Sequence, residues 1–140
     1  ADTLVACGFL SVNKLMRGSL DVEIKRSVKP NQITRLIRDY FEGDLAAINH
    51  IKVRQPGGEF SQAAWREMRK VRSGKVISYS ELAVKAGSPR AVRAAGSACA
   101  KNRVAIVVPC HRIVKTGGGV GNYAYGLKAK EWLLSHEGAF

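Results

Sequence analysis

The residues best placed to do chemistry are a cysteine and a histidine that follow one another, Cys110 and His111. Arg112 comes next, and a basic setting lowers a thiol's pKa and raises its thiolate fraction. Residues 105–108 are mostly β-branched and lead to Pro109, so they predict a buried strand that ends at the proline, which cannot donate a ladder hydrogen bond. We therefore expect the thiol and the imidazole where a strand gives way to a turn.

Two interpretations of Cys110 are open from the residues alone: a buried core residue or a reactive nucleophile. A single cysteine in an apolar segment is more often a small core residue than a nucleophile. Neighbours along a strand point to opposite faces, so Cys110 and His111 can act together only if the backbone turns between them or a water joins them.

The charge of the chain points to a polyanionic partner. The 140 residues include 23 Lys+Arg and 11 Asp+Glu, a net charge of +12, which favours nucleic acid or an acidic membrane surface. The basic residues are spread over 52–54, 66–75, 85–93 and 101–103, so we expect a basic face on folded helices rather than a basic tail. No segment is long and apolar enough to span a membrane, and residues 1–20 do not resemble a signal peptide.

The three cysteines, Cys7, Cys99 and Cys110, give an odd number with no CxxC or Cys/His metal spacing. A disulfide scaffold and a zinc finger are thus disfavoured, and a reducing, cytoplasmic location is expected. We expect no metal and no cofactor. Cys7 and Cys99 are most simply core residues.

The first part of the chain predicts a small α/β unit. Residues 4–15 and 19–28 have strand patterns joined through Gly18, and 48–53 is a further candidate strand. Between them a helix is expected after Asn31, with Gly43 as its C-cap and one apolar face made of Ile33, Leu36, Ile37, Tyr40 and Phe41. Residues 55–58 (Gln-Pro-Gly-Gly) are the best boundary, which divides the chain into domains 1–56 and 57–140.

The second part predicts short helices. The first is capped by Ser61 and ends at 73–74, and its apolar positions are Ala64, Trp65, Met68 and Val71. A short strand is expected within 75–79, then a helix from Ser80 to Gly87, and then a helix over 90–100 with Ser88 as N-cap and Pro89 in its first turn. Two helices joined by a tight turn have the helix-turn-helix layout. A last helix, Leu127–His136, should place Trp132 and Leu133 inward and Lys128 and Lys130 outward.

The helix over 90–100 consists of Ala, Gly and Ser apart from Arg90, Val92, Arg93 and Cys99. Small residues suit tight packing in a core, and they also suit a helix that enters a narrow groove. Arg90 and Arg93, at i and i+3, would share one face. Few side chains could read base edges, which favours minor-groove or backbone binding with little sequence selectivity. The glycine-rich loop 116–126 carries two tyrosines and is not a P-loop, because no Gly-Lys-Ser/Thr follows.

Several motifs together resemble one family. Pro109-Cys110-His111-Arg112 resembles the signature of the O6-alkylguanine-DNA alkyltransferases, also called methylated-DNA–protein-cysteine methyltransferases. Residues 76–79, 91–96, 121–123 and 130–138, and Asn102, match further motifs of that family in order and spacing. The matches span 60–138, and 40–43 resembles a helix of the family's N-terminal domain. The resemblance implies an α+β chain, with a small N-terminal α/β lobe (a ribonuclease H-like sheet with a helix) and a helical winged helix-turn-helix domain that carries the active site.

The resemblance also implies roles for single residues. Cys110 would accept the alkyl group, His111 would be its base through a bridging water, and Glu137 would orient the imidazole. Asn102 would brace the turn. Tyr79 would displace the 3′ phosphate and protonate the leaving guanine, and Arg93 would fill the base stack. The implied DNA-binding residues are Arg93, Arg90, Ala91, Ala94, Gly96, Ser88 and Tyr79, and the implied pocket residues are Tyr123, Val108, Pro109, Cys99 and Tyr125.

The function implied is direct-reversal DNA repair: irreversible, single-turnover transfer of an alkyl group from O6-alkylguanine to Cys110 after base flipping, with O4-alkylthymine left open. The protein would act as a monomer on the minor groove of double-stranded DNA. A non-catalytic lesion binder is disfavoured by the intact Cys110, and an unrelated Cys-His hydrolase by the charge and the small-residue helix. Ala105 and Tyr125 depart from residues found in some members and bear on the acceptance of bulky alkyl groups.

Overall fold

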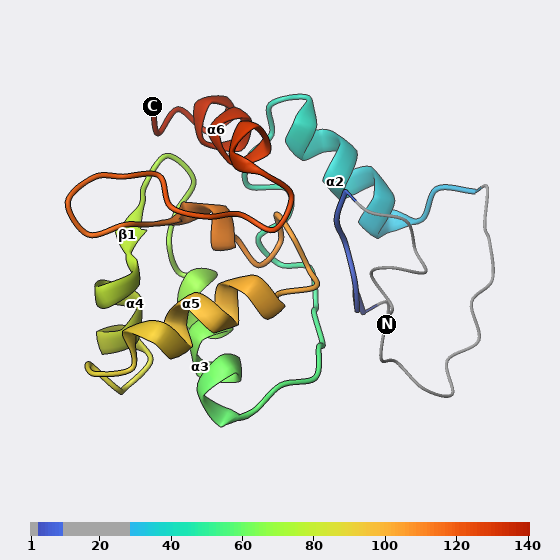
Figure 1. The fold of residues 1–140 in the computed structure, drawn as a ribbon. Coiled ribbons are helices and arrows are strands. Elements are labelled where there is room, and N and C mark those ends of the chain that lie inside the picture. The colour runs from blue at the N-terminus through green and yellow to red at the C-terminus, as the bar shows by residue number, and fades with distance from the viewer. Residues whose placement is uncertain (1–2, 10–28) are drawn as a thin grey trace.

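The computed structural model describes residues 3–9 and 29–140, which form an α+β fold (Figure 1). Its elements, in order, are helices α2 (Gln32–Phe41) and α3 (Glu59–Met68), strand β1 (Ile77–Ser78), helices α4 (Tyr79–Lys85) and α5 (Val92–Lys101), the 3-10 turn η1 (Cys110–Arg112), strand β2 (Ile113–Val114) and helix α6 (Leu127–His136). The strands pair in parallel, with Ile77 opposite Ile113. None of the helices in the described ranges has the length and apolarity needed to cross a bilayer.

The predicted strand over 19–28, the connection at Gly18 and residues 10–15 of the strand predicted over 4–15 lie outside the described residues. In residues 3–9 the backbone makes two isolated parallel bridges, from Leu4 to Val53 and from Cys7 to Val104. The strand predicted over 48–53 is wrong, because residues up to 50 form turns and only Val53 joins a bridge.

Helix α2 agrees with the prediction. The Asn31 side chain accepts a hydrogen bond from Thr34 N at 2.9 Å and so satisfies a free amide of the first turn. Gly43 follows the C-cap with φ +115°, a conformation that glycine adopts without strain. The last turn of the helix contains the fully buried Tyr40, which reaches the site described below.

The next two helices begin earlier than predicted. Helix α3 starts at Glu59 after Gly58, so Ser61 is not its cap, and it ends at Met68 rather than at 73–74. Helix α4 begins at Tyr79 rather than at Ser80, and Ser78 is its N-cap. The Ser78 hydroxyl accepts from Glu81 N at 3.0 Å while the Glu81 carboxylate accepts from Ser78 N at 3.3 Å, a reciprocal capping box.

Helix α5 begins later than predicted, and the reason is a turn. The amide of Ala91 donates to the carbonyl of Ser88 at 2.9 Å, so Pro89 takes the second position of a four-residue turn, where proline is favoured. Arg90 therefore lies before the helix, and the helical face predicted to carry both Arg90 and Arg93 is wrong.

The segment 105–108 is buried, as predicted, but it is not a strand. Residues 105–107 form a turn in which Val107 N donates to Ala105 O at 2.8 Å and Ile106 has φ +72°. A β-branched residue rarely takes this conformation. Burial on all sides rather than strand pairing thus explains the apolar composition, and the turn brings the chain into η1.

The core joins α3, α4 and α5, which lie together on one side of the molecule, while α2 and α6 lie side by side at the other (Figure 1). The Trp65 indole of α3 donates to Ala98 O of α5 at 2.9 Å. Helix α6 buries Leu133 and Leu134. Trp132, predicted inward, is 51 % exposed and stacks on His136 with 4.8 Å between ring centroids. Lys130, predicted outward, is completely buried.

Candidate active site

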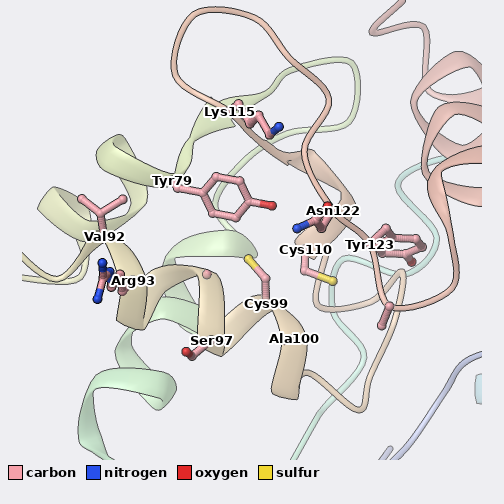
Figure 2. Close-up of a pocket in the computed structure, with 12 residues that line it drawn as sticks. Tyr79, Val92, Arg93, Ser97, Cys99, Ala100, Cys110, Lys115, Asn122 and Tyr123 are labelled. Carbon is pink, nitrogen blue, oxygen red and sulfur yellow. The ribbon is translucent and has the colours of Figure 1, made fainter.

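A cavity of about 590 Å³ opens between α5 and the loop that follows β2. Cys110, Cys99 and Tyr79 extend into it from η1, α5 and α4 (Figure 2). The lining residues are Tyr79, Val92, Arg93, Gly96, Ser97, Cys99, Ala100, Cys110, Lys115, Asn122, Tyr123 and Ala124. The cavity therefore combines two thiols, two aromatic rings and two cations.

Cys110 is the first residue of η1, so the backbone does turn at the Cys-His pair. Its side chain is 6 % exposed, and Asn102 Nδ2 donates a hydrogen bond to Sγ at 3.3 Å. Burial raises the pKa of the Cys110 thiol, while the Asn102 hydrogen bond and the charge of Lys130 lower it in part. The thiol is thus protonated in the free protein and needs a base before it can attack.

His111 has the geometry of such a base. Burial lowers the pKa of its imidazole, and the hydrogen bond that the ring donates to Glu137 only partly offsets this shift, so the ring is neutral at pH 7. Nε2 lies 2.9 Å from Glu137 Oε2, and an ionised carboxylate only accepts, so Nε2 carries the proton. Nδ1 has no hydrogen-bond partner among the described residues and is left with a free lone pair.

The carboxylate of Glu137 gathers four donors from distant parts of the chain. Oε2 accepts from Tyr40 Oη at 2.6 Å, from His111 and from Arg112 Nη2 at 2.8 Å, and Oε1 accepts from Arg112 Nε at 2.8 Å. Arg112 Nη1 also donates to Val71 O at 2.6 Å. Although burial opposes ionisation, the hydrogen bonds from Arg112 and His111 hold the pKa of Glu137 at about 2. Tyr40 and Arg112 were not singled out as site residues.

Lys130, which was predicted to point outward, lies beside the cavity instead. Its Nζ donates to Ile113 O at 2.6 Å and to Asn122 O at 3.0 Å, and it lies 5.8 Å from the centre of the Tyr79 ring. Burial lowers the pKa of this ammonium, and the two pocket thiols, Cys99 and Cys110, oppose the shift. Lys130 therefore connects β2 to the loop that follows it and places positive charge near the reactive sulfur.

The loop after β2 approaches Tyr79 closely at Gly121. Gly121 has φ +81°, and a Cβ there would lie 2.9 Å from the Tyr79 hydroxyl. Burial raises the pKa of Tyr79, so the phenol keeps its proton at neutral pH. The Tyr123 hydroxyl is buried and has no hydrogen-bond partner among the described residues, which leaves it available to a ligand.

Asn102 connects the cavity to the N-terminal part of the chain. Its Nδ2 also donates to Val108 O at 2.8 Å, and its Oδ1 accepts from Val104 N at 3.0 Å and from Gln55 Nε2 at 2.9 Å. Gln55, expected in a boundary loop, is buried and accepts a hydrogen bond from Arg103 N at 2.8 Å. The Gln55 side chain thus helps to hold Asn102, which donates to the Cys110 thiol.

The structure brings together part of the predicted set. Six of the predicted residues line the cavity: Tyr79, Arg93, Gly96, Cys99, Cys110 and Tyr123. Asn102 is hydrogen-bonded to Cys110, and His111 is hydrogen-bonded to Glu137. Ser88, Arg90, Ala91, Ala94, Val108, Pro109 and Tyr125 are not among its lining residues. Tyr125 packs edge-on against Tyr123 at 5.4 Å instead. Lys115 and Asn122 line the cavity without having been singled out. Within the described ranges, no cluster of three possible metal ligands is present.

Comparison with known proteins places these residues in a family. Residues 59–139 match the family model described as "6-O-methylguanine DNA methyltransferase, DNA binding domain". The chain is 39 % identical over 112 residues to a Salmonella typhimurium protein named methylated-DNA–protein-cysteine methyltransferase, covering 80 % of this chain and 66 % of that one. A human protein of the same name is 44 % identical over 114 residues, 76 % of this chain and 55 % of its own length.

Solved structures give the same result. The O6-methylguanine-DNA methyltransferase of Pyrococcus kodakaraensis superposes with a TM-score of 0.75 at 30 % identity, over 91 % of this chain and 76 % of that one. Mycobacterium tuberculosis OGT in complex with DNA superposes with a TM-score of 0.67 at 32 % identity, over 75 % and 65 %. The chain spans slightly less than two thirds of the Salmonella relative and about half of the human one. With the family model matched over most of its length, this chain belongs to the 6-O-methylguanine DNA methyltransferase family.

Proposed function

We propose that the protein transfers an alkyl group from O6-alkylguanine in DNA to Cys110 Sγ. The observation that carries this proposal is the buried Cys110–His111–Glu137 arrangement beside an open cavity, with Nδ1 of a neutral imidazole unpartnered. A nucleophile, a base and a carboxylate that orients the base form the usual constellation for nucleophilic catalysis. The two methyltransferase names among the relatives support the same chemistry.

The proton and bond changes balance as follows. His111 Nδ1 takes the thiol proton, directly or through a water, and Glu137 stabilises the imidazolium that forms. The thiolate attacks the alkyl carbon, the carbon–O6 bond breaks and a thioether forms. The guanine leaves as an anion and takes a proton from the Tyr79 hydroxyl, which regains one from solvent. Because nothing in the site reverses a thioether, each molecule would act once.

Binding to double-stranded DNA would use α5. The helix borders the cavity with small residues and with Arg93, and it suits the minor groove with little base reading. A base inside a duplex cannot reach a buried thiol, so it must be flipped, and Arg93 would take its place in the stack. The net charge of +12 supports the attraction to phosphates. In this proposal α4 and α5 form the helix-turn-helix of a winged domain over 57–140, residues 1–56 belong to a ribonuclease H-like lobe, and a monomer acts in the cytoplasm.

The test is the mass of the protein after incubation with duplex DNA that contains O6-methylguanine. One added methyl group on the peptide with Cys110 is expected for the wild type and for Cys99→Ala, and none for Cys110→Ala. The Cys110→Ala variant should bind DNA within about tenfold of the wild type, or ~1.4 kcal/mol, because the thiol makes no phosphate contact. Tight lesion binding without any adduct on the wild type would instead identify a non-catalytic binder.

A further inference from the structure

A second cavity lies between the segment 52–55 and helix α3 and is lined by several basic residues. Its volume is about 580 Å³, and it is formed by the first described residues, the segment 52–55 and one side of α3. Its lining residues are Thr3, Lys52, Val53, Arg54, Gln55, Gln62, Trp65, Arg66, Arg69 and Val108. Four of these ten are cationic and none is acidic, and no residue is shared with the first cavity.

Two polar side chains of this cavity, Gln62 and Arg69, are held in place before any ligand arrives. Gln62 Nε2 donates to Gln55 O at 2.7 Å and to Gly57 O at 3.4 Å. Arg69 Nη2 donates to Asn49 O at 3.1 Å and to Ile48 O at 3.4 Å. Both of these hydrogen bonds use one nitrogen of Arg69, and a guanidinium has five N–H donors, so donors remain for a ligand. Ordering these two side chains around a ligand would cost little entropy.

We propose that this cavity is a second phosphate-binding site that takes the phosphates of a nucleic-acid strand. A concave site with one sign of charge focuses the field and raises the local concentration of anions. Arginine, lysine, glutamine and threonine are side chains that contact phosphate oxygens in nucleic-acid complexes. Arg54, Arg66 and Lys52 are exposed and can reach the backbone of a strand without being desolvated. The site needs no alkylated base, so the proposal stands apart from the transfer reaction.

The connection to the thiol adds a consequence. Gln55 lines this cavity and donates to Asn102, and Asn102 donates to Cys110 Sγ on the other side. A strand bound in this second cavity would therefore lie against Gln55, which is linked through Asn102 to the reactive sulfur. By thermodynamic linkage, if a bound strand changes the free energy of a change in state at the thiol, that change in state alters the free energy of strand binding by the same amount.

The test uses an oligothymidylate single strand, which contains no guanine, and inorganic phosphate as separate ligands. The readout is the NMR resonances of the Gln62 side-chain amide and the Trp65 indole. We expect the strand to shift both, and to do so in Arg93→Ala as well, which weakens the first cavity only. Inorganic phosphate should give the same shifts at more than tenfold higher concentration.

The decisive variant is Arg54→Gln/Arg66→Gln, with Arg35→Gln/Arg38→Gln as the control that removes two exposed arginines from α2 outside both cavities. Loss of two phosphate contacts should reduce the slope of log affinity against log salt by about 1.4 for a single strand, and the control should leave the Gln62 and Trp65 shifts intact. Equal binding by the two double variants would overturn the proposal. Equal affinity for phosphate and for the strand would overturn the assignment to nucleic acid.

Discussion

Glu137→Gln should be one of the most destabilising conservative substitutions in this protein. The carboxylate receives four hydrogen bonds on two oxygens. An amide has one accepting oxygen and a donating NH2, so at least one donor would face another donor. If the amide oxygen serves Tyr40, His111 and Arg112 Nη2, the NH2 faces Arg112 Nε.

The magnitude follows from the charge that is left behind. Arg112 is 4 % exposed, and in the variant it would keep its hydrogen bond to Val71 O but lose the negative charge that neutralises it. Removing one member of a buried ion pair costs about 3–5 kcal/mol, a large part of the ~5–15 kcal/mol available to a domain. The pKa of Glu137 is lower in the folded protein than its ordinary value of 4.5. The ionised carboxylate therefore stabilises the fold at pH values above 4.5, and this stability is lost as the pH falls towards 2. That shift corresponds to about 3 kcal/mol at neutral pH.

The assay is urea unfolding of the wild type and of Glu137→Gln between pH 7 and pH 2.5. The wild type should lose stability through this window, and the variant should be weaker at pH 7 and change less on acidification. Glu131→Gln, on the exposed face of the same helix, is the matched control and should resemble the wild type. Adding Arg112→Met to Glu137→Gln should recover part of the loss, because no buried charge is left unpaired. Equal stability of Glu137→Gln and Glu131→Gln, with the same acid limb, would refute the reasoning.

Three further variants test other contacts. Lys130→Met removes a cation that lowers the pKa of Cys110, so alkylation of the thiol by a small electrophile should move to higher pH, whereas Lys128→Met should not change the profile. Gly121→Ala places a Cβ 2.9 Å from the Tyr79 hydroxyl and should slow transfer more than Gly117→Ala, which has φ +95° but open space; similar rates would remove Tyr79 from the mechanism. Arg93→Ala should reduce repair of duplex DNA more than DNA affinity, since unstacking a base costs on the order of a few kcal/mol, and an unchanged duplex rate would exclude that role.

Local chemistry accounts for the parts of the fold that the sequence predicted well. Asn31 and Gly43 bound α2 because a cap and a left-handed residue act on their immediate neighbours. The turn at Cys110 followed from Pro109, which limits pairing. The predicted start of α4 at Ser80 missed the cap: Ser78 is the residue with which Glu81, three positions later, forms a capping box, so the helix begins at Tyr79.

Burial in the tertiary fold accounts for the parts that were missed. A lysine on a short helix is usually solvated, yet Lys130 shares a face with Leu133 and Leu134 at i+3 and i+4, a spacing that indicated the buried side. Its partners, Ile113 O and Asn122 O, are backbone atoms, which residue types do not reveal. Tyr40 lies 97 residues from Glu137, so no local pattern could join them.

The order of synthesis has a consequence for the thiol. The carboxylate that orients His111 comes from residue 137, at the C-cap of α6, whereas the thiol, its amide donor Asn102 and the base all precede it. Chains leave the ribosome from the N-terminus at roughly 5–20 residues per second. During the interval before α6 emerges, the nascent chain holds a cysteine without its oriented base. In the proposed mechanism, transfer that depends on the oriented base therefore begins only after translation has passed residue 137 and the last helix has docked.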